Sequence, residues 1–411
     1  MDLMLSILIL MVRVLWDTLT SPSFLIIYCL LILITNRQYK RLEDMSARSR
    51  HNYPQHFKAT LVSVGLGLVG GIIGSFILLL IGIDLGRVNI LPLWIAALLL
   101  MMISPRFLCF AYAGGVLAII SLITGYPEMD IPQLMALVAV LHIVESLLIR
   151  LNGSLNPVPV YVKREKGLIG GFNLQKFWPI PLLALASTGL LADPGALPHM
   201  PAWWPLLKSY SAAVPGQNYI LLPVLAILGY GEMTTTATPN QRIRRSSSYL
   251  LLFSLILLTL AIGSSYHPGL LWAAAIFAPL GHEVVIWLGS RQERKQSAIY
   301  VAGKPGLMLL DVVPGSPAYR AGLRSADRIL AVNGQKIEHY QDLMWIIQQE
   351  SAYYEIEASR QNTVCHTRLQ CPASQDWGLT PVPDAGVARY IALPDGNLFS
   401  FLRRLQHLFT R

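Results

Sequence analysis

Charged residues are scarce in this chain. Of its 411 residues only 13% are Asp, Glu, Lys or Arg, and 54% are hydrophobic, whereas a soluble domain carries about 25% charged residues. A disordered chain has the opposite composition, with few apolar residues and many charges. The composition therefore argues against a water-soluble enzyme and against a disordered protein.

Cysteine is also scarce, with four residues in all: Cys29, Cys109, Cys365 and Cys371. Four cysteines are too few for a disulfide framework in a chain of this length. The first two lie in apolar runs, where we expect them to pack as small hydrophobic side chains. The last two fall on one expected strand, and six residues of extended chain would separate their sulfur atoms by about 20 Å. They cannot bind one metal ion together in that conformation.

Motifs of catalysis and cofactor binding are missing as well. The sequence has no P-loop, no dinucleotide-binding fingerprint and no nucleophile elbow. Its nearest approach to a metal motif is Gly281-His282-Glu283. A zinc hydrolase of the H-E-x-x-H type needs a second histidine one helical turn later, and Ile286 occupies that place. We therefore expect no catalytic residue, no metal and no cofactor.

Long apolar runs fill the first 289 residues. A spanning helix needs about 20 apolar residues, and the candidate runs cover residues 22–36, 59–83, 88–103, 107–124, 132–149, 179–192, 219–231, 248–263 and 268–288. The opening run, residues 3–16, is an uncleaved signal-like start, an interfacial helix or a further span. The sequence predicts an α-helical multi-span transmembrane domain over residues 1–289, with about 8 to 10 helices.

Basic residues gather in alternate loops between these runs. They occupy residues 37–58, 150–176, 242–245 and 291–295, and Arg106 stands in a tight turn. Lys and Arg mark the cytoplasmic loops of membrane proteins, so one alternating path places these loops and everything after residue 289 in the cytoplasm. A β-branched stretch within the second loop predicts a small hairpin near residues 152–178. The net charge of +9 thus indicates topology rather than nucleic-acid binding.

Two polar pairs interrupt the apolar runs: His142 with Glu145, and His282 with Glu283. Ionisable residues within spanning helices suggest a function by default. We expect both to be intramembrane polar pairs that are hydrogen-bonded within the bundle or directed at a partner. Gly67, Gly70, Gly71 and Gly74 form ridges of small residues, which predict a close helix contact within the chain or between chains.

Short strands and helices replace the apolar runs over residues 297–371. The segments V-x-P-G-S-P-A-x-x-A-G-L and D-R-I-L-x-V-N-G begin at Val312 and Asp327, and a helix is expected near residues 340–349. In this order they resemble the bacterial type of PDZ domain. The resemblance implies a small α/β fold, a β-sandwich-like partial barrel with two helices. Ala326 stands where the family usually has glycine, which is unfavourable if that turn needs a positive φ.

The PDZ resemblance also implies a binding mode. An extended ligand pairs with a sheet edge while a helix supplies side-chain pockets, and a ligand carboxylate would lie at the loop before the strand. The expected peptide-binding residues are Gly303, Lys304, Gly306, Leu307, Met308, Leu309, Leu310, Tyr340, Leu343, Met344 and Ile347. The alternative, strongest for Leu343 and Ile347, is that the helix residues fill the core.

The last 40 residues, 372–411, form a tail that contains a second segment expected to contact the membrane. Over residues 397–411, Phe401 and Leu405 fall on the apolar face of a helix, and Arg403 and Arg404 fall on its basic face. A helix of this kind lies on an anionic membrane surface. The alternative is a helix that docks on the PDZ domain.

The whole architecture resembles the MinJ family, topological determinants of cell division in Gram-positive bacteria. The residues that carry this resemblance include Arg150-Leu-Asn-Gly153, Phe177-Trp-Pro179, Gly281-His-Glu283 and Trp287-Leu-Gly289. It implies a non-enzymatic membrane scaffold that links the polar protein DivIVA to the division inhibitors MinC and MinD, enriched at septum and poles. Expected partners are proteins in the PDZ groove and membrane lipid, without nucleic acid, and a homo-oligomer is an open alternative.

Two other classes stay open. Site-2 intramembrane metalloproteases combine H-E-x-x-H with PDZ domains, so the chain could be a degenerate or regulatory relative of these enzymes. A transporter-like protein with a PDZ appendage would favour repeated halves with broken helices, and the sequence shows no internal repeat.

Overall fold

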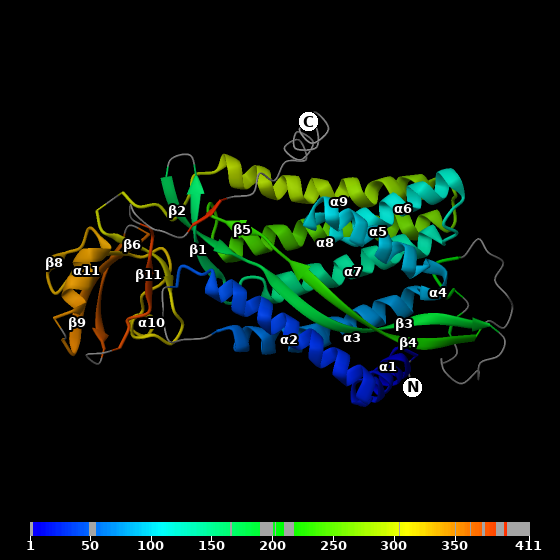
Figure 1. The fold of residues 1–411 in the computed structure, drawn as a ribbon, viewed down its shortest axis with the longest axis horizontal. Helices are drawn as coiled ribbons and strands as arrows, with labels where there is room; N and C mark the ends of the chain where they lie inside the picture. The colour runs from blue at the N-terminus through cyan, green and yellow to red at the C-terminus, as the bar shows by residue number, and fades with distance from the viewer. Residues whose placement is uncertain are drawn as a thin grey trace.

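The computed structural model consists of a long helical region followed by a smaller, sheet-rich region at one end of the molecule (Figure 1). It describes residues 3–48, 55–164, 167–189, 200–201, 203–208, 218–303, 305–349, 351–361, 363–371, 375–383 and 390–392. This order of a helical region with several apolar helices and then a PDZ-like sheet confirms the predicted fold class.

Nine α-helices and one short 3-10 helix form the described part of the first region. They are α1 (Leu3–Thr20), α2 (Pro22–Asp44), α3 (His56–Ile81), α4 (Leu85–Val88), α5 (Ile90–Ile103), η1 (Pro105–Leu108), α6 (Phe110–Thr124), α7 (Ile131–Asn152), α8 (Pro239–Ser264) and α9 (Leu270–Lys295). By length and composition α3, α7, α8 and α9 can each cross a membrane, and the pair α1–α2, bent by 82°, can supply a fifth span. Helix α7 is the most buried of these, whereas α9 exposes an apolar face that includes Trp272, Ile276 and Leu280.

Helices α5 and α6 are shorter than the spans expected over residues 88–103 and 107–124. They have 14 and 15 residues, which is about 21 Å of helix each. The turn between them holds Arg106 and Cys109, which contact Glu283 and His142 near the middle of α9 and α7. Glu283 compensates the charge of Arg106 inside the helical region.

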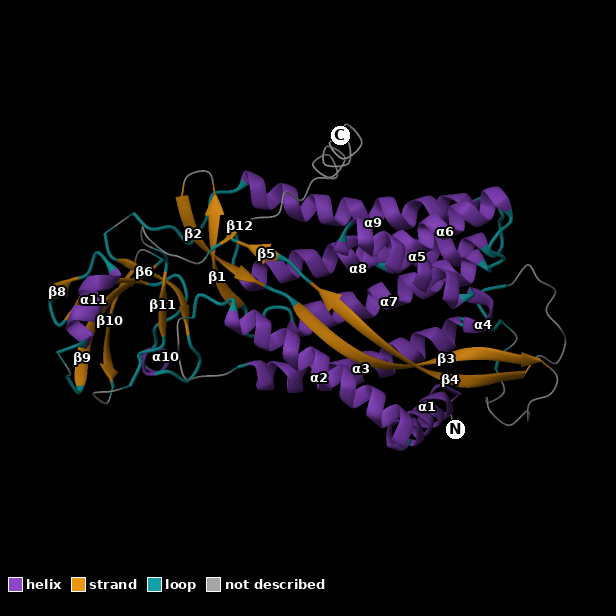
Figure 2. Cartoon of the chain, in the orientation of Figure 1, coloured by secondary structure: helices purple, strands orange, loops and turns teal. Residues whose placement is uncertain are grey.

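Two apolar runs that the sequence predicted as spanning helices form strands instead. Strand β3 (Lys176–Gly189) and strand β4 (Asn218–Tyr230) pair as an antiparallel ribbon, which runs beside the helices (Figure 2). Pro179, Pro181 and Pro223 explain the difference, because proline inside a helix removes a hydrogen bond and clashes with the preceding turn. In a two-stranded ribbon, proline is tolerated where its nitrogen faces away from the partner strand.

The outer edge of β3 is covered by helix α3 and its neighbours. Backbone N–H groups along this edge donate to side chains, as Leu183 does to Ser75 (2.8 Å) and Phe177 to the Tyr39 hydroxyl (3.2 Å). Pro179 and Pro181 have the same orientation by alternation and lack the N–H altogether. Their carbonyl oxygens face α3 so closely that a Cβ on Gly67 or Gly71 would lie 2.2 Å or 2.1 Å from them.

The glycine ridges of α3 thus have two different partners. Gly67 and Gly71 contact the backbone of β3, Gly70 faces Val144 of α7, and Gly74 faces side chains of both, Val144 and Leu182. The sequence predicted a close contact at this place, and the helix partner is present. The strand contact was not predicted, because the partner segment was taken for a helix.

A small sheet joins the helical region to the C-terminal region. It has the order β12 (Ile391–Ala392), β1 (Val158–Arg164), β2 (Gly167–Asn173) and β5 (Met233–Thr234). Its β1–β2 hairpin lies where the sequence placed one. Glu293, near the end of α9, accepts hydrogen bonds from Thr235, Thr236 and Arg164, which connects this sheet to α9.

The C-terminal region contains a second sheet of order β10-β9-β7-β6-β11, with β8 paired to β7. Its elements are β6 (Leu307–Val312), α10 (Pro317–Arg320), β7 (Arg328–Val332), β8 (Gln335–Lys336), α11 (Tyr340–Ile347), β9 (Tyr353–Arg360), β10 (Thr363–Gln370) and β11 (Leu379–Pro381). Ala326 has a φ of 71°, so the turn before β7 does need the conformation that favours glycine.

We expect that glycine at position 71 is required for the close packing of β3 against α3. Gly71→Ala forces the ribbon and the helix apart and should destabilise the folded protein by about 1 to 3 kcal/mol. Thermal unfolding of the full-length chain in mild detergent, followed by tryptophan fluorescence, measures this loss. Gly65→Ala is the matched control, because a Cβ there meets nothing within 4 Å. An equal melting temperature for both variants would contradict the contact.

Candidate functional site

The expected peptide-binding strand, β6, lies inside its sheet. One edge pairs with β7 through Leu307 and Met308, and the other pairs with β11 along Leu309–Val312. Val382 also donates its backbone N–H to the carbonyl oxygen of Met308. The edge predicted to be open for a ligand is therefore occupied by the chain's own segment 379–382, which the sequence analysis had assigned to the tail.

Glycines precede β6 as predicted. Gly303 and Gly306 have φ values of 109° and 95°, so their backbone adopts conformations that side chains disfavour. Lys304 lies outside the described residues. The two glycines of the turn before β6 therefore adopt the left-handed backbone region.

Helix α11 divides its predicted binding residues between core and surface. Leu343 is buried with Ile346 in the PDZ core, which is the alternative raised for it above. Ile347 is half-buried, whereas Tyr340 and Met344 are 38% and 36% exposed, and the adjacent Trp345 is 58% exposed. The exposed face of α11 therefore offers an aromatic and thioether surface, of the type enriched where proteins bind one another.

The start of α11 is fixed by Asp342. Its carboxylate accepts hydrogen bonds from the backbone N–H groups of Glu338 (3.0 Å) and His339 (2.8 Å). These hydrogen bonds stabilise the charged form and lower the pKa of Asp342. Burial raises the pKa of the neighbouring Tyr340, so its hydroxyl stays neutral at physiological pH.

The PDZ region is attached to the small joining sheet and to the segment that follows α2 by polar contacts. Arg48 Nε lies 2.7 Å from Asp311 Oδ2, and both side chains are almost buried. Gly170 donates its N–H to the carbonyl oxygen of Tyr300 (2.9 Å), and the Tyr161 hydroxyl donates to the carbonyl oxygen of Pro381 (3.1 Å). These contacts reach β6 and β11, so the PDZ sheet is docked on the helical region by that side.

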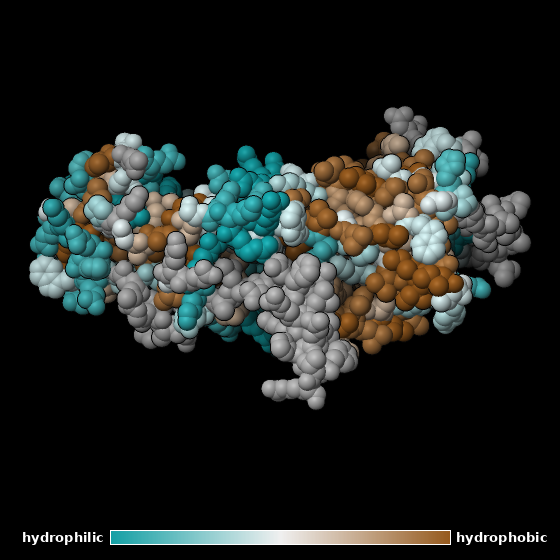
Figure 3. Space-filling view, turned by 90° about the horizontal axis from the view of Figure 1, so that it is seen from above, coloured by the Kyte–Doolittle hydropathy of each residue, from teal (hydrophilic) through white to brown (hydrophobic). Residues whose placement is uncertain are grey.

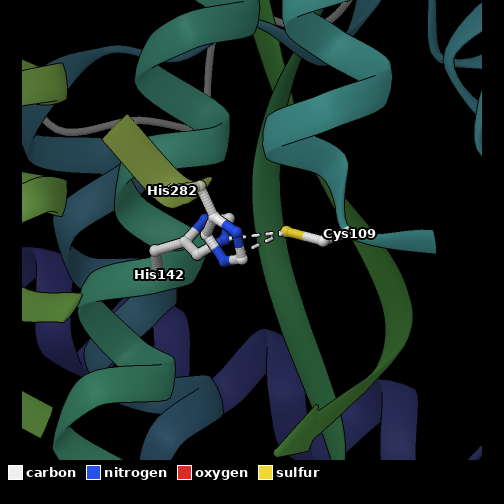
Figure 4. Close-up of side chains that lie close together, drawn as sticks. All are labelled: Cys109, His142 and His282. Atoms are coloured by element: carbon white, nitrogen blue, oxygen red, sulfur yellow. Dashed lines mark hydrogen bonds between the residues drawn. The ribbon is translucent and has the colours of Figure 1, made fainter. Parts of the chain in front are cut away.

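The two predicted intramembrane polar pairs meet in space. The rings of His142 and His282 have centroids 5.3 Å apart, and Cys109 lies beside both (Figure 4). Glu283 accepts hydrogen bonds from Arg106 (2.8 Å) and from the Tyr112 hydroxyl (2.6 Å). The sequence identified both pairs but not Cys109, because nothing in a single apolar run distinguishes a packed cysteine from one that meets histidines.

A large open cavity of about 2680 Å³ lies next to this cluster. Its walls include Leu31 of α2, Glu145 of α7, His282 of α9 and residues 225–230 of β4. The cavity thus brings an apolar surface, a strand and the polar cluster together within the helical region. The predicted membrane-surface residues Phe401, Arg403, Arg404 and Leu405 lie outside the described residues.

Comparison with known proteins supports the resemblances. The sequence profile of the PDZ domain matches residues 309–352. The crystal structure of the PDZ domain of an SdrC-like protein from Listeria monocytogenes is 18% identical, covers 20% of this chain and 85% of that one, and has a TM-score of 0.17, so the PDZ assignment depends on the profile.

A relative of known role matches a longer stretch. The chain is 26% identical over 230 residues to the cell division topological determinant MinJ of Bacillus subtilis, which is 55% of this chain and 54% of that protein. It therefore spans about half the length of the relative it matches. The chain is MinJ-like and carries a PDZ domain.

Proposed function

We propose that this protein is a membrane-held PDZ adaptor that recruits protein partners during placement of the division septum. The observation that carries the proposal is the similarity to MinJ over 230 residues together with a PDZ domain. The four to five candidate spans provide the membrane anchor, and a PDZ domain is a module for protein–protein interaction.

The finer proposal is that the adaptor bridges DivIVA to MinC and MinD. It comes from the resemblance noted in the sequence, and it is compatible with the separation of the chain into a helical region and a PDZ region. A docked PDZ domain leaves the exposed face of α11 for one partner, while the helical region holds the complex at the membrane. We also propose a non-enzymatic role, which the similarity to MinJ and the PDZ domain support.

We further propose that the PDZ region faces the cytoplasm. Support comes from the basic residues at the helix ends beside the joining sheet: Arg41 in α2, Arg150 in α7, and Arg294 and Lys295 in α9 lie in last turns, and Arg242, Arg244 and Arg245 lie in the first turns of α8. Figure 3 shows hydrophilic surface over the PDZ end and the middle of the molecule, and hydrophobic surface over the far half. Basic residues at one end of a helical membrane domain favour the cytoplasmic side.

The domain limits are part of the proposal: a transmembrane domain over residues 1–289, a PDZ domain over 297–371 and a tail over 372–411. The pairing of β11 with β6 favours a PDZ domain that extends to about residue 383. The membrane-surface role of residues 397–411 is proposed on their sequence pattern alone.

A fluorescent fusion of the full-length chain should gather at the septum and the poles of its native cell, and deletion of the protein should misplace septa. A fusion that ends at residue 296 is the control, because it keeps the candidate spans but lacks the PDZ domain. We expect its signal to remain in the membrane and to lose the enrichment. Diffuse membrane signal from the full-length fusion, with normal septa after deletion, would contradict the assignment.

Cysteine labelling should place the PDZ region inside the cell. Tyr126→Cys introduces a thiol at a 76% exposed position between α6 and α7, and Glu338→Cys introduces one at an exposed position of the PDZ region. With a membrane-impermeant maleimide on intact cells, we expect labelling at 126 and not at 338 until the membrane is permeabilised. The unsubstituted chain controls for its own cysteines, and labelling at 338 in intact cells would reverse the topology.

A photo-crosslinking amino acid at position 345 should capture partner proteins in the native cell, because Trp345 projects from the exposed face of α11. The matched control is position 364, where Val364 is 49% exposed on β10. We expect crosslinked species at 345 in several-fold excess over 364. Equal yields at the two positions would remove α11 as the recognition surface.

A further inference from the structure

We propose that Cys109, His142 and His282 form a zinc-binding site inside the helical region. The three residues come from the N-terminal cap of α6, the middle of α7 and the middle of α9. Figure 4 shows both imidazoles and the thiol directed toward one another. One ligand atom of each lies within 4.8 Å of the others.

The distances between the groups fit a metal centre. Cys109 Sγ lies 3.1 Å from His142 Nε2 and 3.7 Å from His282 Nε2. Bond lengths of about 2.3 Å to sulfur and 2.0 Å to nitrogen in a tetrahedral zinc site place such atoms about 3.5 Å apart. The two sulfur–nitrogen distances differ from this value by a few tenths of an ångström, and the ligand atoms of the two histidines lie within 4.8 Å of each other.

The protonation of His142 favours binding. Its Nδ1 lies 2.7 Å from the backbone carbonyl oxygen of Val138, and a carbonyl oxygen can only accept, so Nδ1 must carry the proton. Nε2 then presents a lone pair toward Cys109. A histidine ligand held by a hydrogen bond from its other nitrogen to a carbonyl is the usual arrangement in metal sites.

His282 presents its Nε2 to the same place. Nε2 lies 3.7 Å from Cys109 Sγ, while Nδ1, on the other side of the ring, is buried without a hydrogen-bond partner within the described part of the chain. A neutral imidazole that binds a metal ion through Nε2 carries its proton on Nδ1, so His282 would be a ligand without the second hydrogen bond that His142 makes. Packing of the rings of Tyr112 and Phe253 against His282, with centroids 5.3 Å and 5.6 Å away, limits its freedom to turn elsewhere.

The ligand set selects the ion. One thiolate and two imidazoles suit zinc, whereas magnesium and calcium prefer oxygen ligands. Three protein ligands leave a fourth tetrahedral position for a water molecule or for Glu145, which stands one helical turn from His142 and lines the same cavity. The site differs from the H-E-x-x-H arrangement, because the second histidine comes from α7 rather than from position 286.

The test is the metal content of the full-length protein, purified in mild detergent without a polyhistidine tag. Plasma mass spectrometry should find about one zinc ion per chain, and Cys109→Ser and His142→Gln should each reduce it to background. Cys29→Ser is the matched control, since Cys29 is exposed on α2 and should leave the zinc content unchanged. Size-exclusion profiles identify any variant that fails to fold.

Cobalt provides a second readout, which begins with the native chain. After removal of zinc with a chelator, added Co²⁺ should give the sulfur-to-metal charge-transfer band of a thiolate site in the native chain and in Cys29→Ser, but not in Cys109→Ser. Absence of both zinc and a cobalt band in the native protein would overturn the proposal. So would full zinc content in the Cys109→Ser, His142→Gln double variant.

Discussion

The backbone of a strand that runs among apolar helices must have its polar groups satisfied, and the arrangement around β3 follows from this constraint. Within a bilayer an unpaired N–H or C=O costs several kcal/mol. Strand β4 satisfies one edge of β3. At the other edge, prolines remove two donors, Ser75 and Tyr39 accept from two more, and Gly67 and Gly71 bring the helix backbone against the remaining carbonyl oxygens. Substitutions at these glycines therefore act on the strand as much as on the helix.

The need to pair polar groups also explains the contacts inside the helical region. Arg106 lies at the tip of a short helical hairpin and is neutralised by Glu283, and Glu283 in turn accepts from Tyr112. This hairpin also carries Cys109 to the level of His142 and His282. A partly buried ion pair and a candidate metal site are thus positioned by one feature, the limited length of α5 and α6. The PDZ region is connected to this framework through the ion pair of Arg48 and Asp311.

Much of the fold follows from the sequence, and the failures have physical causes. The PDZ segment was recognised because its turns need particular residues, and even the strained Ala326 was identified from the motif. The runs at 179–192 and 219–231 were taken for helices because periodicity is uninformative when almost every residue is apolar; prolines two residues apart in β3 were the available signal. The pairing of β11 with β6 and the meeting of Cys109 with His282, 173 residues away in sequence, are set by tertiary packing and leave no local pattern.

The two edges of the β3–β4 ribbon differ in how their backbone hydrogen-bonding groups are used. The edge formed by β3 is covered by helices, and its Pro179 and Pro181 have no N–H to donate. Along the other, the alternation of the ladder directs the backbone groups of Leu221, Leu225 and Ile227 in β4 away from β3. Among the described residues, none of them bonds to the backbone of another element, and Pro223 lacks the N–H. The unused hydrogen-bonding capacity of the ribbon therefore lies on one edge, at β4, whose residues 225–230 also line the open cavity.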